Sequence, residues 1–252
     1  MQIPSINTIE FTNACNFNCA YCQRNNEDGK RPIAFLDPSL VRKLIGEGAF
    51  ENTAYIEFQQ NGEPTLHPQF AELVTMIREQ VPYIGMSTNA TFIRKADEAM
   101  LHAVRSMDLI TISIHPQTRL EDIINVSQAL EDSRTRIRVQ MLEEETYDID
   151  MGALSCLRNI SIDNYPLRVF GCNYGKKRFC ADLHYGVTIQ ADGDVVPCCN
   201  VVGKQKVLGN VCKDSLADIW ANSDHKMFEY CKTCRTPSPF AHRLSFFDTS
   251  IN

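Results

Sequence analysis

The sequence predicts an α/β fold: a partial (β/α)6 TIM-like barrel, followed by a small C-terminal unit built from a β-hairpin and a helix. The barrel is indicated by short β-rich runs that alternate with amphipathic helical patterns up to about residue 165. Such alternation favours parallel βα units with right-handed crossovers, and a doubly wound sheet is the alternative. After Cys180 this alternation of β-rich runs and helical patterns ends, which indicates the smaller unit. We therefore expect a barrel at 1–165, an auxiliary unit at 166–235 and a tail at 236–252.

Five of the runs are expected to be strands, because β-branched and aromatic residues are frequent in them. They are Thr8–Phe11, Ala54–Gln59, Tyr83–Ser87, Leu109–Ile114 and Ile137–Leu142. A sixth strand is expected at Ile160–Ile162 or at Leu167–Phe170. Ligands of parallel barrels bind at the carboxyl ends of the strands, so the site residues are expected there.

Helical patterns with one apolar face separate these strands. Asp37 followed by Pro38 is typical of a helix start, since aspartate caps the first turn and proline fits its first position. The stretch from Phe70 to Val81 and the run Ala99–Val104 carry the next two patterns. Thr118 and Glu121 resemble a capping box that opens a fourth helix.

The C-terminal unit has the pattern of a hairpin and a short helix. Residues 185–190 and 195–197 flank the turn sequence Ala-Asp-Gly-Asp at 191–194. Ser215 is then expected to cap a helix that contains Trp220. This segment has too little apolar sequence for a large core of its own, so a metal site would supply the missing stabilisation.

Length and composition limit the class of protein. The 252 residues include 44% hydrophobic and 22% charged side chains, which is enough for a packed core. The net charge of −6 argues against a face that binds duplex nucleic acid. No apolar run reaches the roughly 18 residues that a membrane helix needs, and the N-terminus lacks the pattern of a signal peptide. We expect a cytoplasmic protein without membrane contact.

Eleven cysteines are the most informative feature of the composition. In a reducing cytosol, clustered cysteines hold metal more often than they form disulfides. Cys15, Cys19 and Cys22 follow the first strand with the spacing C-x3-C-x2-C. Three thiolates on one tight loop can ligate three irons of a cubane cluster, which leaves the fourth iron open to an amine and a carboxylate. A structural zinc site is the alternative, although zinc usually needs a fourth ligand and none lies nearby in sequence.

This loop, with Tyr21 directly before its last cysteine, resembles the cluster loop of the radical S-adenosylmethionine (SAM) superfamily. Asn-Gly-Glu-Pro at 61–64 follows the second strand and resembles the GEP-type motif of that family. The resemblance implies that a [4Fe–4S] cluster on the three cysteines reduces bound SAM, and that the resulting 5′-deoxyadenosyl radical abstracts a substrate hydrogen. The SAM contacts that we expect on this basis are Tyr21, Asn61, Gly62, Glu63, Pro64, Ser87, Asn89, Ser113, Gln140 and Met141.

Four further cysteines form a second group. Cys180 and Cys198 flank the expected hairpin, and Cys231 and Cys234 form a C-x2-C pair. Together with the intervening segment 208–220, this order resembles the twitch domain, a shortened relative of the SPASM domain, as found in aminocyclitol dehydrogenases. The resemblance implies that the four cysteines ligate a second [4Fe–4S] cluster, with Cys199 as a substitute for Cys198. A zinc ribbon is the alternative.

Full ligation by four cysteines would leave no open iron for a substrate, so the second cluster is expected to carry an electron. We therefore expect a two-electron oxidation of a polar small molecule, with a reducing donor such as flavodoxin or ferredoxin. A proton must also leave the substrate, which requires a base. His115, Arg168 and the run of glutamates at 143–145 are the candidates by position.

Other reactions stay open at this stage. Cys172 is a candidate donor of a hydrogen atom, and in that case the reaction is an epimerisation. Cys156 and Cys212 have no assigned role. The alternative functions are a peptide maturase that epimerises or crosslinks its substrate, and an enzyme that rearranges or modifies a nucleoside or DNA base. The remaining alternative function is that of a zinc-binding module without enzyme activity.

Overall fold

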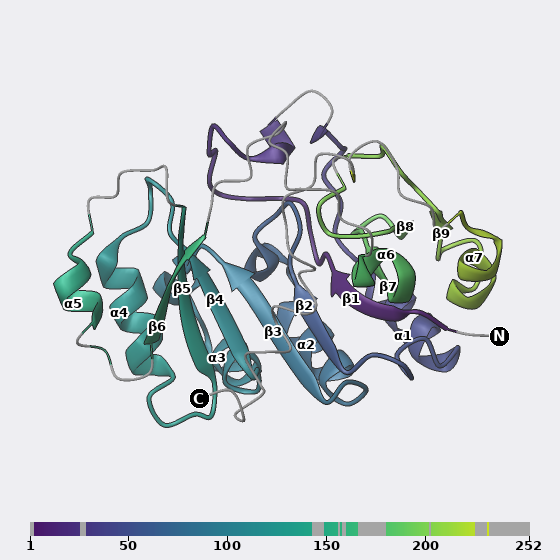
Figure 1. The fold of residues 1–252 in the computed structure, drawn as a ribbon. Helices are drawn as coiled ribbons and strands as arrows, with labels where there is room; N and C mark the ends of the chain where they lie inside the picture. Colours follow the sequence, from purple (N-terminus) through teal and green to yellow (C-terminus); the bar gives the residue numbers. More distant parts are fainter. Residues whose placement is uncertain are drawn as a thin grey trace.

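Nine strands form one sheet in the part of the chain that the structure describes (Figure 1). The computed structural model describes residues 3–25, 29–142, 149–155, 157, 160–165, 180–201, 203–224 and 231. The strands are β1 Ser5–Ile9, β2 Tyr55–Phe58, β3 Tyr83–Thr88, β4 Leu109–Ser113, β5 Arg136–Leu142, β6 Ile160–Tyr165, β7 Gly186–Ile189, β8 Asp194–Val196 and β9 Gly209–Asn210. Their order across the sheet is β6-β5-β4-β3-β2-β1-β7-β8-β9.

The first six strands are parallel and lie side by side in chain order. A doubly wound sheet would reverse its strand order at a switch point, whereas a barrel keeps adding strands in one direction. The observed order therefore confirms the predicted partial barrel. The sixth strand is the Ile160–Tyr165 segment, and the alternative at Leu167–Phe170 lies outside the described residues.

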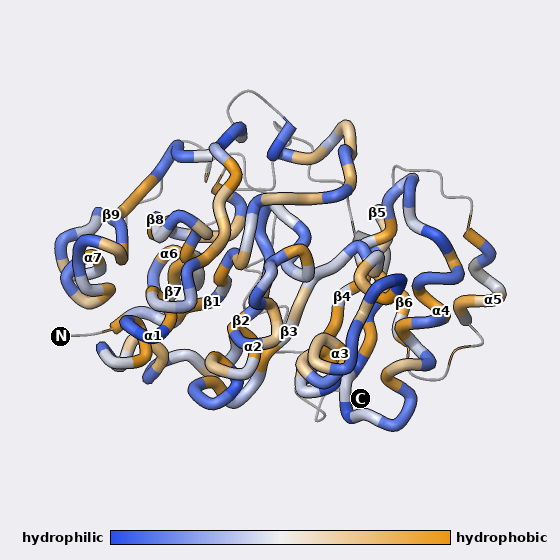
Figure 2. The backbone as a smooth tube through the Cα atoms, turned by 180° about the vertical axis from the view of Figure 1, so that it is seen from behind, coloured by the Kyte–Doolittle hydropathy of each residue, from blue (hydrophilic) through white to orange (hydrophobic). Residues whose placement is uncertain are grey.

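The larger helices lie along one face of the sheet, and Figure 2 shows apolar segments concentrated in the strands and on the adjoining helices. The helices are α1 Pro38–Gly46, α2 Phe70–Arg78, α3 Glu98–Arg105, α4 Leu120–Ala129, α5 Met151–Ser155, α6 Ala181–Tyr185 and α7 Leu216–Asn222. Short 3-10 turns are η1 Gln23–Asn25, η3 Pro64–Leu66 and η4 Thr91–Arg94. The core between sheet and helices is built from alternate strand residues such as Ile56, Phe58, Ile110 and Ile112, each completely buried.

The helix starts are partly as predicted. The Asp37 carboxylate accepts from the amide of Ser39 at 2.7 Å, and the Ser215 hydroxyl accepts from the amide of Asp218 at 3.1 Å. Both caps are therefore confirmed. The capping box at Thr118 is wrong: α4 begins after Arg119 without a side-chain cap, because the Thr118 hydroxyl instead accepts from the amide of His115 at 2.9 Å.

The first strand also differs from its prediction. It spans Ser5–Ile9 instead of Thr8–Phe11, because this earlier segment pairs with β7 from Ser5 to Ile9, with one register shift between Ile6 and Thr8. After the strand, the carbonyl of Phe11 accepts from the amide of Leu36 at 2.8 Å and not from a neighbouring strand. The chain leaves the sheet at this point and continues into the cysteine loop.

The predicted hairpin is present and extends the barrel sheet. β7 and β8 are antiparallel, and the turn between them contains Gly193 with a φ of +84°, which glycine adopts without strain. β7 is parallel to β1, so the hairpin and the barrel share one continuous sheet. The domain boundaries themselves remain a prediction. Among the described residues, no helix has the length and apolar character needed to cross a membrane.

Candidate functional site

A cavity of about 210 Å³ opens at the carboxyl ends of β1 to β4. We call it the thiol cavity, because three cysteines lie in its wall. Its lining residues are Cys15, Phe17, Cys19, Tyr21, Cys22, Gln59, Gln60, Asn61, Gly62, Glu63, Ser87, Thr88, Asn89, Ser113 and His115. Segments far apart in sequence meet here because parallel strands bring all their carboxyl ends to one edge.

Backbone and side-chain hydrogen bonds hold the cysteine loop in a tight turn. The amide of Cys22 donates to the carbonyl of Cys19 at 3.0 Å, and the Asn25 amide donates to the Cys22 carbonyl at 2.9 Å. The side chains of Asn25 and Arg24 donate to the carbonyls of Cys19 and Phe17 at 2.7 and 2.9 Å. The loop therefore presents its three thiols to the same cavity.

The chemistry of these donors fits an iron–sulfur cluster. All eight cysteines within the described residues are free of disulfides. Burial raises the pKa of Cys15, and it raises the pKa of Cys19 to about 11, so without a cation these two thiols keep their protons near neutral pH. Among the described residues, no three Cys, His, Asp or Glu side chains lie close enough together to chelate a single metal ion. A cubane places each thiolate on a different iron.

The loop after β2 packs directly on the cysteine loop. A methyl group at Gly62 would lie 2.0 Å from the carbonyl oxygen of Thr12 and 2.6 Å from that of Ala14, so only glycine fits. The amide of Glu63 donates to the Ala14 carbonyl at 2.8 Å. This close backbone contact therefore determines the distance between the cysteine loop and the carboxyl ends of the strands.

The Glu63 carboxylate turns inward and joins two strand ends. One oxygen accepts from the hydroxyls of Thr65 and Thr88 at 2.6 and 2.8 Å, and the other accepts from the amide of Asn89 at 2.8 Å. Burial raises the pKa of Glu63, while these hydrogen bonds oppose the rise. Most of the carboxylate's acceptor capacity is used within the protein, so its main contribution here is to hold the walls of the cavity.

Asn89 has a similar bracing role. Its side-chain oxygen accepts from the Thr91 hydroxyl at 2.6 Å, and its nitrogen donates to the side-chain oxygen of Asn16 at 2.7 Å. Asn16 in turn donates to the Thr91 hydroxyl at 2.8 Å. This closed ring of hydrogen bonds ties the cysteine loop to the end of β3.

His115 and Tyr21 meet across the cavity. The Tyr21 hydroxyl and His115 Nδ1 are 2.6 Å apart, and the two rings lie 5.9 Å apart between centroids. Burial lowers the pKa of His115 to about 4, so its imidazole is neutral near pH 7. The hydroxyl can therefore donate to Nδ1, which orients the ring toward the cysteine loop.

The structure brings most of the expected SAM contacts together. Tyr21, Asn61, Gly62, Glu63, Ser87, Asn89 and Ser113 line the thiol cavity together with His115. Pro64, Gln140 and Met141 are not among its lining residues: Pro64 begins η3, and the other two lie within β5. Phe17, Gln59 and Gln60 also line the cavity, and Asn16 braces it, although the sequence pattern did not indicate these four residues. The position of Gln59 and Gln60 directly after β2 was the available signal.

The second cysteine group is described in part. Cys180 directly precedes α6, and Cys198 and Cys199 follow β8 on the hairpin side of the sheet. Cys231 is also described, while Cys234 lies outside the described residues. The same holds for the expected catalytic residues Arg168 and Cys172, for the glutamates at 143–145 and for Cys156. Cys212 is exposed and lies beside the hairpin turn, with its thiol 3.9 Å from the carbonyl of Asp192.

Two family models match this architecture. Residues 9–143, more than half of the chain, match the radical SAM superfamily, and residues 180–236 match an iron–sulfur cluster-binding domain, SPASM. The chain therefore belongs to the radical SAM superfamily and carries a C-terminal domain of the SPASM and twitch type. Its cofactors are accordingly SAM and [4Fe–4S] clusters, one for the barrel and additional iron–sulfur binding in the C-terminal domain.

The curated relatives are longer than this chain and match it over part of its length. A tungsten-containing aldehyde ferredoxin oxidoreductase cofactor-modifying protein of Pyrococcus furiosus is 26% identical over 124 residues, which cover 48% of this chain and 34% of that protein. A GTP 3′,8-cyclase of Chlorobaculum tepidum is 27% identical over 168 residues, which cover 63% of this chain and 47% of the cyclase. The matched segments thus span only about a third to a half of these relatives.

Solved structures share the fold over nearly the whole chain. BtrN, in complex with AdoMet and 2-DOIA, has a TM-score of 0.60 and 19% identity, covering 97% of this chain and 90% of BtrN. SuiB of Streptococcus suis, bound to the precursor peptide SuiA, has a TM-score of 0.68 and 14% identity, covering 96% of this chain and 73% of SuiB. At these identities the similarity establishes the fold and leaves the reaction to the site itself.

Proposed function

We propose that this chain oxidises a polar small molecule by two electrons, using SAM at the thiol cavity and an auxiliary [4Fe–4S] cluster as the acceptor of the second electron. The observation that carries this proposal is the position of the two cysteine groups. The cysteine loop follows β1 and the hairpin begins with β7, and these two strands are direct neighbours in one sheet. An electron acceptor would therefore lie beside the cavity in which the substrate reacts.

The barrel residues would hold the first cluster and SAM. Cys15, Cys19 and Cys22 would supply the three thiolates, and the backbone at Gly62 would let the cofactor approach closely. When bound, the reduced cluster and SAM supply the 5′-deoxyadenosyl radical that abstracts a substrate hydrogen. The hydrogen-bond ring at Asn16 and Asn89 and the carboxylate of Glu63 would keep the cavity walls rigid, which favours one alignment of the substrate C–H bond.

The lining residues that are not assigned to SAM indicate the kind of substrate. Gln59 and Gln60 offer uncharged amide groups at the end of β2, and the imidazole of His115 is neutral near pH 7. A polar molecule with hydroxyl groups can form hydrogen bonds to such groups. We therefore favour a hydroxylated small molecule.

The auxiliary cysteines would serve the oxidation step. Ligation by Cys180, Cys198, Cys231 and Cys234 would leave no open iron, so that cluster would take an electron and would not bind substrate. The substrate also releases a proton, for which His115 is the candidate inside the cavity and Arg168 a further one. A flavodoxin or ferredoxin would supply the first reducing electron.

The test is a product analysis with anaerobically loaded protein, SAM, dithionite and pools of hydroxylated metabolites. Oxidation predicts a product that lacks two hydrogen atoms and forms in equal amount to 5′-deoxyadenosine. An epimerisation would leave the mass unchanged in water and add one deuterium in D2O. Replacing Cys172 by alanine would abolish an epimerisation and spare an oxidation. Absence of any oxidised product, with 5′-deoxyadenosine formed, would contradict the proposed reaction.

Two other substrate classes have specific support. The fold of SuiB, which was solved with a precursor peptide, is shared over 96% of this chain, so a peptide is the second candidate. The partial match to GTP 3′,8-cyclases makes a nucleoside the third. Each class can be added as a separate pool in the same product analysis.

A further inference from the structure

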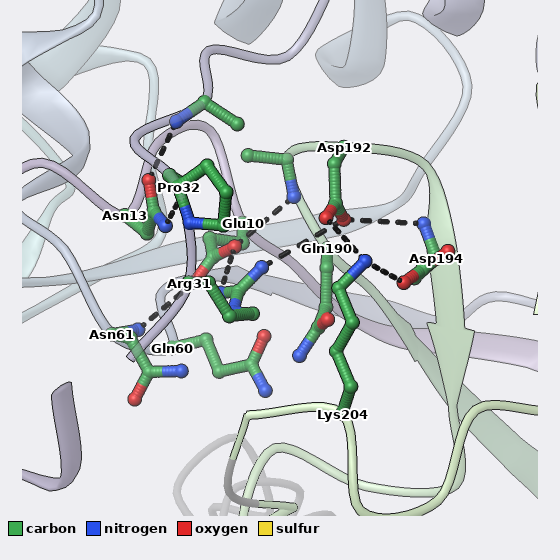
Figure 3. Close-up of polar contacts among 12 residues, drawn as sticks. Glu10, Asn13, Arg31, Pro32, Gln60, Asn61, Gln190, Asp192, Asp194 and Lys204 are labelled. Atoms are coloured by element: carbon green, nitrogen blue, oxygen red, sulfur yellow. Dashed lines mark hydrogen bonds and ion pairs between the residues drawn. The ribbon is translucent and has the colours of Figure 1, made fainter. Parts of the chain in front are cut away.

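We propose that Glu10 and Arg31 form a positioning pair that fixes the hairpin arm against the thiol cavity. The hairpin arm is defined here as residues 186–201, from β7 to the turn after Cys198 and Cys199. The pair lies where β1 ends and the hairpin turns, as Figure 3 shows. The inference rests on the proposed function, because it assigns the pair a task in electron transfer from the substrate in the thiol cavity to the second cysteine site.

The Glu10 carboxylate accepts hydrogen bonds from both sides of this junction. One oxygen accepts from the amide of Asn61, in the loop that lines the thiol cavity, at 3.2 Å. The other accepts from the amide of Ala191, in the hairpin turn, at 3.0 Å. The amide of Glu10 also donates to the carbonyl of Ile189 at 2.8 Å. A single side chain thus joins the cavity loop to the hairpin arm.

Arg31 holds this carboxylate in place. Its Nη2 lies 2.6 Å from both oxygens of Glu10, and its Nη1 lies 3.7 Å from the carboxylate of Asp192 in the hairpin turn. Glu10 and Arg31 are only 1% and 2% exposed, so neither charge is compensated by water. Removing Arg31 would leave the buried Glu10 without a counter-charge, and removing Glu10 would leave Arg31 with only the more distant Asp192. The outer carboxylates, Asp192 and Asp194, are tied to Lys204 at 3.1 and 2.7 Å.

Two glutamine amides brace the same junction (Figure 3). Gln60, which lines the thiol cavity, donates to the carbonyl of Val201 at 3.4 Å, and Gln190 donates to the carbonyl of Gly203 at 3.3 Å. Val201 closes the turn after Cys198, because its amide donates to the carbonyl of Cys198 at 3.2 Å. The buried side-chain oxygens of both glutamines, and Nε and Nη1 of Arg31, have no hydrogen-bond partner among the described residues.

The consequence concerns the distance between the substrate in the thiol cavity and the second cysteine site. Electron transfer from the substrate to that site is efficient only at a short, defined separation, and the segment with Cys198 reaches the barrel through β7, β8 and this junction. If Glu10 is lost, β7 stays paired with β1, but the turn at 191–192 is released from the cavity loop. The arm would then sample several positions relative to the cavity.

The experiment compares Glu10→Gln and Arg31→Lys with Asp108→Asn as the matched control. Asp108 accepts from Arg78 at 2.5 Å and from the amide of Ile84 at 2.9 Å, at the opposite end of the strands from Glu10. This pair has the same groups but is partly exposed, and it does not touch the thiol cavity. In Glu10→Gln the new side-chain NH2 group would face only N–H donors, from Arg31 and from a backbone amide, and would have no acceptor. Arg31→Lys keeps the charge but loses the planar guanidinium.

Each protein is loaded with both clusters, reduced, and studied by EPR for the magnetic coupling between the clusters, together with SAM affinity and unfolding temperature. We expect a broader range of couplings and a SAM Kd raised about fivefold or more in the Glu10 and Arg31 variants. Asp108→Asn should lower the unfolding temperature and leave both readouts as in the wild type. Couplings and SAM affinity equal to those of the control would overturn the positioning role. If Glu10→Gln does not fold, Arg31→Lys alone decides.

The same experiment separates this inference from the proposed function. If the wild type holds both clusters and oxidises its substrate while the variants match the control, only the positioning role is wrong. If the wild type itself holds one cluster, then the proposed electron transfer fails and the positioning role fails with it.

Discussion

Gly62 shows how strongly a single residue can determine the thiol cavity. A methyl group here would lie 2.0 Å from a carbonyl oxygen of the cysteine loop, and backbone of this kind cannot move aside locally. We expect Gly62→Ala to displace the loop and to lower the bound iron from roughly eight to roughly four atoms per chain, as the first cluster is lost. Iron and sulfide analysis after anaerobic reconstitution measures this.

Gly46→Ala is the control for that substitution. Gly46 ends α1, and an added methyl group would meet nothing within 4 Å. Alanine is favoured over glycine in a helix by roughly 0.5–1 kcal/mol, so this variant should bind the full amount of iron and unfold no earlier than the wild type. Equal iron content in both variants would contradict the account of Gly62.

His67 gives the fold a predictable dependence on pH. Its Nε2 lies 2.9 Å from the carbonyl of Leu36 and therefore carries the proton, while Nδ1 accepts from the amide of Gln69 at 3.0 Å. Burial lowers the pKa of His67 below its ordinary 6.5. As the pH drops below 6.5, His67 becomes protonated in the unfolded chain but stays neutral in the folded protein. The free energy of unfolding therefore decreases until the pH reaches the lower pKa of the folded state.

The measurement is the free energy of unfolding as a function of pH for the wild type and His67→Gln. The wild type should lose up to about 1.4 kcal/mol per pH unit from this group as the pH drops below 6.5, and the variant should lose less. His102→Gln, an exposed position on α3, serves as control and should follow the wild type. A variant curve parallel to that of the wild type would refute the assignment.

At the residue scale, the positions of the site residues could be predicted from the sequence, whereas the hydrogen bonds among them could not. The cysteines, Gly62 and the polar residues after β2, β3 and β4 could be predicted, because strand ends and spacing are local features. The bonds of Glu63 to Thr88 and of Asn89 to Asn16 could not, because they join residues more than twenty positions apart. Contact of Glu63 and Asn89 with SAM stays a prediction beside these bonds to protein groups.

At the scale of elements, the hairpin raises the choice between Cys198 and Cys199. The two cysteines lie in the turn that follows β8, where the Val201 amide donates to the Cys198 carbonyl at 3.2 Å, and the resemblance to the twitch domain assigns the ligand role to Cys198. We expect Cys198→Ala to lose about half of the bound iron and Cys199→Ala to retain all of it. The first cluster should still cleave SAM in both variants. The reverse result would exchange the two cysteines in the ligand set.

Element starts were predictable where one local side chain decides them. Asp37 and Ser215 cap their helices because the acceptor and the free amides lie within three residues. Thr118 fails as a cap because its hydroxyl finds a competing partner, the amide of His115, on the other side. The first strand was misplaced because its limits depend on β7, which follows in sequence by about 180 residues. Local pattern carries no information about that pairing.

At the scale of the whole molecule, the barrel and the hairpin form one sheet. The sequence pattern changes after Cys180, which favours two separate units, but β7 lies parallel to β1 in the same sheet. This arrangement places Cys198 and Cys199 after a hairpin whose first strand pairs with β1 at the edge of the barrel. The Glu10–Arg31 junction is a buried ionic contact at this edge.

The measurement that tests the central claim most directly is SAM cleavage by the cysteine loop. Protein reconstituted anaerobically and reduced with dithionite should convert SAM to methionine and 5′-deoxyadenosine in equal amounts, and a variant with alanine at Cys15, Cys19 and Cys22 should form neither. Iron-loaded, reduced wild-type protein that leaves SAM intact would contradict the account.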